Sequence, residues 1–274
     1  MARFFVDQKQ AVLLGSAAQI ADMAGASDAT VVRTAKSLGF DTLSALREVL
    51  LSDLTGSPSP GARLERTLEE AGARAGATLG HVVTLHEQVL AVLKRPDVAS
   101  SFEQAVDILA GAGRRHIFGI GPSGAMAEYA TLQFNRIGLP TNAMSVSGIG
   151  LADRLMAMQA GDAVLMMAYA PLYREVTVVL DESERLGIPV VLVSDNLGPI
   201  VAGQVAAVLP IPRGKADHLA MHGGTAVLIE ALIIGLAGRS RDTAIGSLDR
   251  LSSLRGALDK SWSKRGVKKS KETK

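Results

Sequence analysis

The chain has 274 residues, with 29 Lys and Arg against 27 Asp and Glu, 47% hydrophobic residues and no cysteine. This length provides material for two domains or one large one with a buried core, and the hydrophobic content excludes an intrinsically disordered chain. Without cysteine, disulfides and thiolate metal sites are excluded, which suits the reducing cytoplasm where we expect the protein.

Residues 17–33 predict two short helices joined by a tight turn. Apolar residues repeat at helical spacing from Ala17 to Ala24. Gly25 can adopt the positive φ that ends a helix, and the Ser27 hydroxyl can cap the next helix by accepting a hydrogen bond from an amide of its first turn. In that second helix Val31, Ala35 and Leu38 are expected to face the first helix.

Two helices that meet through a turn of small residues are typical of the helix-turn-helix, which places its second helix in a DNA major groove. We therefore predict a double-stranded DNA operator as a partner. The predicted DNA-binding residues are Ser27, Asp28, Ala29, Thr30, Arg33 and Lys36. Asp28, Ala29 and Arg33 are expected to face base edges, and the other three to contact phosphates.

The alternative is a helical hairpin that only packs against the rest of the protein. Residues 1–55 carry five Lys and Arg against six Asp and Glu, so this region is not basic overall. Because DNA affinity depends on neutralising phosphates, positive groups must then gather on one face. Arg33, Lys36 and Arg47 are the candidates for such a face.

The composition changes after Asp53. Residues 54–61 contain two prolines, two glycines and two serines, which predicts a linker. Helical periodicity returns over residues 63–94, and another helix is predicted over 100–112. We expect a DNA-binding domain over residues 1–55, followed by a linker and bridging helices over residues 56–114.

Beyond residue 114 short apolar runs alternate with helical stretches. The runs are 116–120, 140–144, 163–168, 189–193 and 206–211, and the helical stretches are 124–137, 151–158, 173–186, 199–204 and 222–236. Strands that alternate with helices and are buried on both faces predict an α/β fold with a doubly wound parallel sheet of about five strands over residues 115–240. Ligands bind such sheets at the carboxyl ends of the strands.

The loop Gly119–Gly124, Gly-Ile-Gly-Pro-Ser-Gly, follows the first predicted strand. Its glycines allow close approach to the backbone, Ser123 offers a hydroxyl, and amides at a helix start can bind an anion. A tight strand-to-helix turn explains the same pattern. The loop matches neither a dinucleotide fingerprint nor a Walker loop, and no cofactor is predicted.

Two resemblances coincide along the chain. Residues 16–40 resemble the N-terminal domain of RpiR-family bacterial transcription regulators, and residues 115–236 resemble the sugar isomerase (SIS) domain that follows it in that family. The matching features are the Gly119-x-Gly-x-Ser123 loop, Ala160-Gly-Asp162 before the third strand, and Leu186–Asp195 around the fourth. The resemblance implies a three-layer αβα domain that senses a phosphorylated sugar or related small anionic metabolite.

The resemblance also implies a ligand site, which we assign to Gly119, Gly121, Ser123, Gly124, Ser145, Ser147, Tyr169 and Arg174. Family members hold phosphate with the serine of the first loop and with a loop rich in serine and threonine after the third strand. Here that second loop is Ala168-Tyr-Ala-Pro-Leu-Tyr-Arg174, without serine or threonine. Arg174 can offer a bidentate contact instead, and Ser145 and Ser147 either compensate or serve only as turn residues.

Two other functions remain open. A sugar-phosphate isomerase or lyase requires an acid–base group, for which Glu128, His218, His222 and Glu230 are candidates. His218 and His222 are four residues apart and can share a helix face, but no third ligand supports a metal site, and neither a metal site nor a catalytic residue is predicted. Alternatively, the second domain serves only oligomerisation.

We expect a homodimer or homotetramer on a two-fold operator, because one helix-turn-helix contacts few bases. The bridging helix (64–92) and the final helix (227–236) offer apolar faces for this contact. Residues 241–274 are expected to be a helix remnant and a disordered tail, with eight Lys and Arg between Arg255 and Lys274. The longest apolar run, 224–238, contains Glu230, so no membrane partner is expected.

Overall fold

The computed structural model describes residues 1–40, 42–47, 50, 59–72, 74–215 and 217–258. They form two compact units. The first comprises Met1–Val89, Tyr169–Thr177 and Pro212–Met221, and the second comprises Leu90–Ala168, Val178–Ile211 and the residues from His222 onward. The predicted linker over 54–61 lies mostly outside the described residues.

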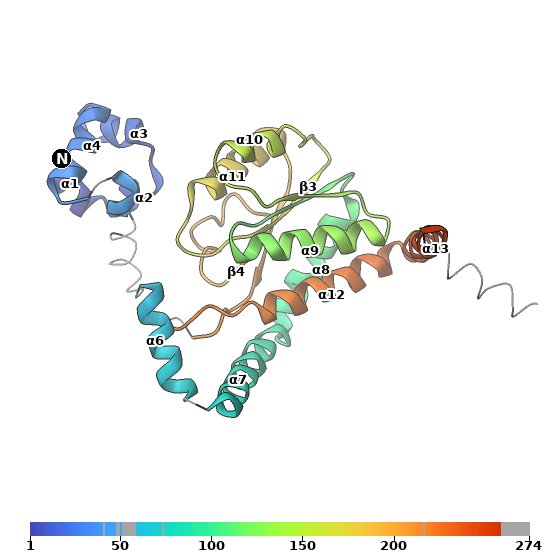
Figure 1. Cartoon of the computed structure of the whole chain (residues 1–274). Helices are drawn as coiled ribbons and strands as arrows, with labels where there is room; N and C mark the ends of the chain where they lie inside the picture. The colour runs from blue at the N-terminus through green and yellow to red at the C-terminus, as the bar shows by residue number, and fades with distance from the viewer. Residues whose placement is uncertain (41, 48–49, 51–58, 73, 216, 259–274) are drawn as a thin grey trace, which may run out of the picture. The chain divides into compact units, whose positions relative to one another are not determined.

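The N-terminal part of the first unit is a small helical bundle of α1 (Ala2–Asp7), α2 (Lys9–Leu14), α3 (Ala17–Ala24) and α4 (Asp28–Ser37) (Figure 1). Its core consists of Phe5, Val12, Ile20, Ala21, Val31, Ala35 and Leu46. As predicted, Gly25 ends α3 at φ 63°, and the Ser27 hydroxyl accepts a hydrogen bond from the Thr30 amide at the start of α4.

Two details of this bundle differ from the prediction or add to it. Leu38 is 46% exposed rather than buried, because it lies at the C-cap of α4, where the chain leaves helical geometry. Ser16 and Gln19 form a reciprocal capping box at the start of α3, which the sequence reading missed.

Three helices lead from this bundle to the sheet: α6 (Pro60–Ala71), α7 (Ala75–Leu93) and α8 (Pro96–Gly111). The prediction of uninterrupted helix over residues 63–94 is wrong, because α6 ends at Gly72, where φ is 74°. Proline occupies the first turn of both α6 and α8, where its missing N–H costs no hydrogen bond.

The second unit contains the predicted parallel sheet. Its strands are β1 (Arg115–Phe118), β2 (Thr141–Met144), β3 (Ala163–Met167), β4 (Val190–Ser194) and β5 (Ala207–Pro210), in the order β2-β1-β3-β4-β5. Every pairing is parallel, and all residues of β1, β3 and β4 are buried. The winding direction reverses between β1 and β3, where doubly wound folds bind ligands.

Helices cover both faces of this sheet: α9 (Pro122–Arg136), α10 (Ile149–Leu155), α11 (Arg174–Leu186) and α12 (Gly223–Arg239). In Figure 1, α8, α9 and α12 lie on one side of the strands and α10 and α11 on the other. Residues of α8, α9 and α12 share a hydrophobic core with the strands. The fold is therefore the three-layer αβα arrangement that the sequence predicts.

Two predictions for the second unit fail. Residues 199–204 form turns rather than a helix, although Leu197 and Val201 are buried. The region after residue 240 begins with a full helix, α13 (Arg241–Leu258), so Arg255–Leu258 are helical; the rest of the predicted tail lies outside the described residues. Among the described helices none is by itself long and apolar enough to cross a membrane.

A buried hydrogen bond between a histidine and an aspartate lies at the amino ends of two neighbouring strands. His116 of β1 and Asp162, directly before β3, are both at most 2% exposed, and His116 Nε2 lies 2.9 Å from Asp162 Oδ2. The same carboxylate oxygen accepts a hydrogen bond from the Gln159 amide. Asp162 is one of the residues that carried the SIS resemblance, and the structure gives it this structural role at the edge opposite the expected ligand site.

Candidate functional site

The exposed face of α4 carries the predicted DNA-binding residues. Asp28, Ala29, Arg33 and Lys36 are exposed, whereas Val31 and Ala35 are fully buried on the opposite face. Arg33 Nε donates a hydrogen bond to the Ala29 carbonyl 3.2 Å away, which holds the arginine along the helix. A row of polar side chains thus lies on one side of a capped helix, as a recognition helix requires.

Ser27 and Thr30 lie at the start of the same helix, and both take part in its cap. The Ser27 hydroxyl accepts from the Thr30 amide at 3.3 Å, and the two hydroxyl oxygens are 2.9 Å apart. Since a hydroxyl that caps a helix still has acceptor and donor capacity, this position remains compatible with the predicted phosphate contacts. No DNA contact is tested by the structure, and the six residues stay a prediction.

Arg47 does not contribute to the basic face. Its Nε donates to the Val12 carbonyl at 2.8 Å, and its Nη2 donates to the Gly15 carbonyl. These carbonyls lie at the C-terminal end of α2, where helices leave acceptors without partners. The sequence interpretation of Arg47 as a phosphate-facing residue is therefore wrong, because its guanidinium donates hydrogen bonds to backbone carbonyls within the bundle.

The Gly119–Gly124 loop connects β1 to α9 and has the tight geometry that its glycines predict. A Cβ at Gly119 would lie 2.4 Å from the Ser123 carbonyl oxygen, and Gly121 has a φ of 58°. A Cβ at Gly124 would lie 3.2 Å from the Gly119 carbonyl oxygen, so the two ends of the loop are in contact. Ser123 is only 6% exposed within this turn.

The loop offers fewer amides to an anion than its sequence pattern predicts. Pro122 occupies the first helical position and has no N–H, and the Gly124 amide donates to the Gly121 carbonyl at 2.9 Å. An anion at this helix start must therefore depend on the Ser123 amide and hydroxyl and on groups from other loops.

Ser145, at the end of β2, is adjacent to this loop, since a Cβ at Gly124 would lie 3.6 Å from the Ser145 Cβ. Its hydroxyl donates to Glu128 Oε1 of α9 at 2.5 Å. The hydroxyl that was expected to bind phosphate is thus engaged by a carboxylate, and phosphate binding would require this contact to open. Ser147 is exposed in the loop that precedes α10.

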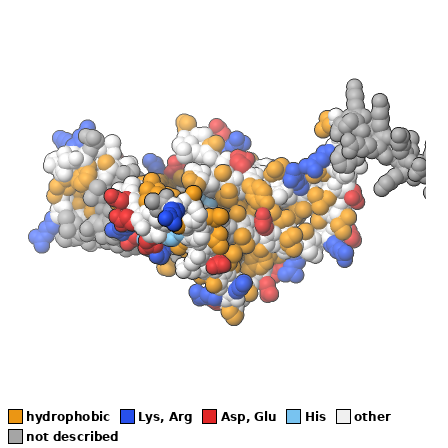
Figure 2. Space-filling view, turned by 60° about the horizontal axis from the view of Figure 1, so that its bottom comes forward, with side chains coloured by type: hydrophobic (Ala, Val, Ile, Leu, Met, Phe, Trp, Pro, Cys, Tyr) orange, Lys and Arg blue, Asp and Glu red, His pale blue; other side chains and the backbone are white. Residues whose placement is uncertain are grey.

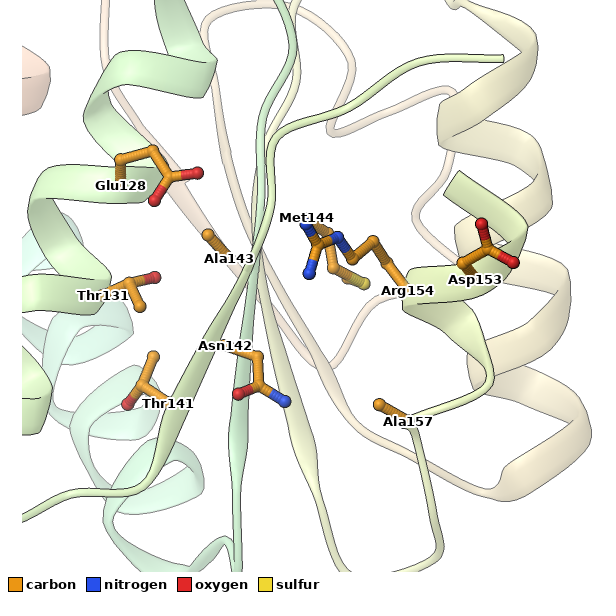
Figure 3. A pocket seen from close by; sticks show the side chains of 9 residues that line it. All are labelled: Glu128, Thr131, Thr141, Asn142, Ala143, Met144, Asp153, Arg154 and Ala157. Atoms are coloured by element: carbon orange, nitrogen blue, oxygen red, sulfur yellow. The ribbon is translucent and has the colours of Figure 1, made fainter. Parts of the chain in front are cut away.

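Glu128 also lines a pocket of about 330 Å³ beside the edge strand β2 (Figure 3). Glu128 and Thr131 come from α9, Asn142 forms part of the floor, and Arg154 comes from α10. Figure 3 shows the Glu128 carboxylate and the Arg154 guanidinium on opposite sides of β2, each pointing toward the strand. Glu128 therefore faces this cavity as well as Ser145.

Tyr169 and Arg174 belong to the first unit, so their predicted grouping with Ser123 and Ser145 stays a prediction. Tyr169 directly follows Ala168 at the end of β3 and is 6% exposed, and Arg174 is exposed at the start of α11. The guanidinium carbon of Arg213 lies 3.9 Å from the centroid of the Tyr169 ring, within the range of a cation–π contact. The sequence reading missed Arg213, because residues 212–221 show no periodicity or motif.

The remaining acid–base candidates do not form a common centre. His218 Nε2 lies 2.9 Å from Glu70 Oε1, whereas His222 is the N-cap residue of α12 and Glu230 is exposed on that helix. Because α12 begins only at Gly223, His218 and His222 do not share a helix face. Within the described part of the chain, no three His, Asp or Glu side chains are grouped so that they could hold a metal ion.

The sequence of this chain is similar to those of known proteins. The SIS domain family profile matches residues 108–234. The bifunctional protein glk of Burkholderia thailandensis is 27% identical over 231 residues, which cover 80% of this chain and 34% of that protein. The HTH-type transcriptional regulator YfhH of Escherichia coli is 28% identical over 176 residues, 63% of this chain and 61% of YfhH. The chain thus spans about a third of the length of glk.

Solved structures show the same fold. The sugar isomerase domain of an RpiR transcription factor from Sphaerobacter thermophilus superposes with a TM-score of 0.55 at 20% identity, covering 63% of this chain and 96% of that domain. The NanR protein of Vibrio vulnificus, solved with ManNAc-6P, has a TM-score of 0.57 at 18% identity and covers 94% of this chain and 92% of NanR. Residues 108–234 thus match the SIS domain family, and these solved structures share the fold of this chain.

Proposed function

We propose that this chain is a DNA-binding transcription regulator, acting in the cytoplasm, whose SIS domain senses a small anionic metabolite of the sugar-phosphate class. The observation that supports this most directly is the combination, in one chain, of a capped helix with an exposed polar face and a SIS fold. The relative YfhH is named an HTH-type transcriptional regulator, which supports the proposal.

The sugar-phosphate class rests on the first loop and on the structural neighbours. The turn at Gly119–Gly124 admits close backbone approach and presents Ser123, which suits a phosphate. NanR, whose fold this chain shares, was solved with ManNAc-6P. We take a phosphorylated sugar or a related sugar acid as the effector, and we assign no catalytic residue to the site.

A homo-oligomer on a two-fold operator forms part of the same proposal. Exposed large hydrophobic side chains lie on α7 and α12, the helices expected to provide subunit contacts: Leu79, Val83, Val227 and Ile234. Figure 2 shows one face of the molecule on which many hydrophobic side chains gather. Such faces favour association with another copy of the chain.

The direct test is operator binding by variants of α4. DNA fragments selected by the purified chain are titrated with the parent, with Arg33→Ala and with Lys36→Ala. We expect Arg33→Ala to lose preference for the selected sequence by about tenfold or more, since one arginine–guanine pair contributes about 1–3 kcal/mol of discrimination. Lys36→Ala should weaken all sequences alike and reduce the salt dependence.

Arg250→Ala, an exposed arginine on α13, is the matched control and should bind like the parent. If Arg33→Ala retains the parent's sequence preference, α4 is not the recognition helix. If the parent selects no DNA at all, the regulator function is wrong.

A further inference from the structure

The strand β2 is paired on one side only, because it lies at the edge of the sheet. The carbonyls of Pro140 and Met144 accept hydrogen bonds from amides of β1 and of the loop that follows it. In a parallel ladder, successive residues of a strand direct their N–H and C=O groups alternately to its two sides. Thr141 and Ala143 therefore direct their backbone groups away from β1.

The outward groups of Thr141 are already bonded to Asn135 of α9. The Asn135 side-chain nitrogen donates to the Thr141 carbonyl at 2.9 Å, and the Asn135 side-chain oxygen accepts from the Thr141 amide at 3.1 Å. An asparagine side chain carries a donor and an acceptor, so it replaces one residue of a further strand here. Ala143 has no such substitute, since neither its N–H nor its C=O is bonded to another described residue.

Ala143 lines the pocket of about 330 Å³ beside β2. Pockets that bind small molecules measure about 300–1,000 Å³, so this one suits a small ligand. Thr131 of α9 also lines the pocket, and Figure 3 shows its hydroxyl directed toward β2. That hydroxyl is buried and has no hydrogen-bond partner among the described residues. A polar ligand in the pocket can supply the missing partner.

Opposite charges flank the open residue. Glu128 of α9 and Arg154 of α10 point toward β2 from its two sides (Figure 3). One oxygen of Glu128 accepts a hydrogen bond from the Ser145 hydroxyl, which leaves the second oxygen for a ligand. Arg154 forms no ion pair with another described residue, so its planar set of N–H donors can bind a carboxylate.

This combination favours a zwitterion over a simple ion. The lining contains the carboxylates of Glu128 and Asp153 and the guanidinium of Arg154. A simple anion is repelled by the carboxylates, and a simple cation leaves Arg154 without a partner. Addition of a peptide strand requires a row of open backbone groups, whereas Ala143 is the one open residue among the four described residues of β2.

We propose that the pocket at Ala143 binds a free α-amino acid. The ammonium group donates to Glu128 and to the Ala143 carbonyl, and the carboxylate accepts from Arg154 and from the Ala143 N–H. Each end of the ligand thus has one side-chain and one backbone partner. The site lies at the outer edge of the sheet, whereas the predicted effector residues lie in loops that follow the strands, so it is a second ligand site beyond the proposed sensing of a sugar phosphate.

The first test titrates the full chain with the common free L-amino acids, first by thermal shift and then by calorimetry. The amide and the N-acetyl derivative of the amino acid that binds most tightly serve as comparisons. Each derivative should bind at least about tenfold more weakly, because amidation removes the carboxylate and acetylation removes the ammonium charge. If no free amino acid binds, or if either derivative binds as tightly as the free amino acid, the inference is overturned.

The second test assigns the two charged side chains. Glu128→Gln and Arg154→Gln should each weaken binding of the free amino acid at least about tenfold. Glu184→Gln on α11 and Arg250→Gln on α13 change exposed residues of the same types and should bind like the parent. Glu128→Gln should change the affinity for the N-acetyl derivative by less than about twofold, since that derivative has no ammonium group. Equal losses for both ligands would mean that Glu128 is only structural, and the site assignment would be wrong.

The third test follows single amides by hydrogen exchange and NMR in the full chain. A saturating amino acid should slow exchange of the Ala143 amide at least about threefold, because the ligand carboxylate accepts its hydrogen bond. The Thr141 amide is the internal control, since it is already bonded to Asn135 and should exchange at an unchanged rate. If exchange at Ala143 is unchanged while the amino acid binds, the ligand occupies another site and the inference fails. None of these tests contains DNA or a sugar phosphate, so their results are independent of the proposed regulator function.

Discussion

The loops that follow β1 and β3 leave neighbouring strands of one sheet, yet different forces shape them. In Gly119–Gly124 the backbone contacts itself so closely that no side-chain atom fits at Gly119. In Ala168–Arg174 side-chain contacts shape the loop, since Tyr169 is buried and its ring contacts the Arg213 guanidinium. We therefore expect an added side-chain atom to destabilise the first loop. The second loop should be destabilised by removal of the Tyr169 ring or the Arg213 guanidinium.

The largest effect is expected from Gly119→Ala. The added Cβ would lie 2.4 Å from the Ser123 carbonyl oxygen and 2.7 Å from its carbon, both backbone atoms that cannot rotate away. We expect the free energy of unfolding in urea to fall by about 3 kcal/mol, together with loss of anion binding.

The matched control is Gly111→Ala at the end of α8, where an added Cβ meets nothing within 4 Å. It should be neutral or stabilise the protein by up to about 1 kcal/mol, because alanine favours helix over glycine. Equal, small effects for both alanine variants would show that the β1 loop is not fixed by its backbone.

An intermediate effect is expected at the second loop. Tyr169→Leu removes the aromatic face on which Arg213 lies, whereas Tyr169→Phe retains it. A double-mutant cycle with Arg213→Gln, measured by urea denaturation, should give a coupling of about 0.5–2 kcal/mol for Tyr169→Leu and near zero for Tyr169→Phe. Zero coupling for both would mean that the stack contributes nothing.

The smallest effect is expected for the change of protein stability at acidic pH. The hydrogen bond from Lys215 holds the pKa of Glu70 below its usual value, with the charge of His218 acting in the same direction. Since the folded pKa is depressed, this carboxylate stabilises the native state above its unfolded pKa and loses that contribution as the pH falls through the folded pKa.

Stability in urea should therefore decline slightly more for the parent than for Glu70→Gln as the pH is lowered through the carboxylate range. Glu69→Gln should follow the parent. A parent and a Glu70→Gln variant with the same pH dependence would argue against an ionised Glu70 in the contact between α6 and the 212–221 segment.

Local patterns predicted most of the fold. All five strands and the turn at Gly25 follow from apolar runs, glycine and capping residues, which act over a few neighbours. The break at Gly72 was missed because apolar residues continue in helical phase on both sides of it. Leu197 and Val201 are buried although residues 199–204 form turns and not a helix, so tertiary packing overrides the local pattern there.

The candidate site was predicted less completely, because its missing parts depend on contacts far apart in sequence. Ser123 and its turn follow from the motif itself. The engagement of Ser145 by Glu128, the use of Arg47 on backbone carbonyls and the position of Arg213 over Tyr169 join residues 17 to 44 positions apart. No pattern in a single sequence marks such pairs.

The position of β2 at one edge of the sheet has a consequence for aggregation. An edge strand with unpaired backbone groups can recruit a strand from another chain. This edge has only four residues, follows directly after Pro140, and is flanked by the charged Glu128 and Arg154. A short edge beside proline and charge discourages strand pairing between chains, and so lowers the risk of aggregation through this sheet.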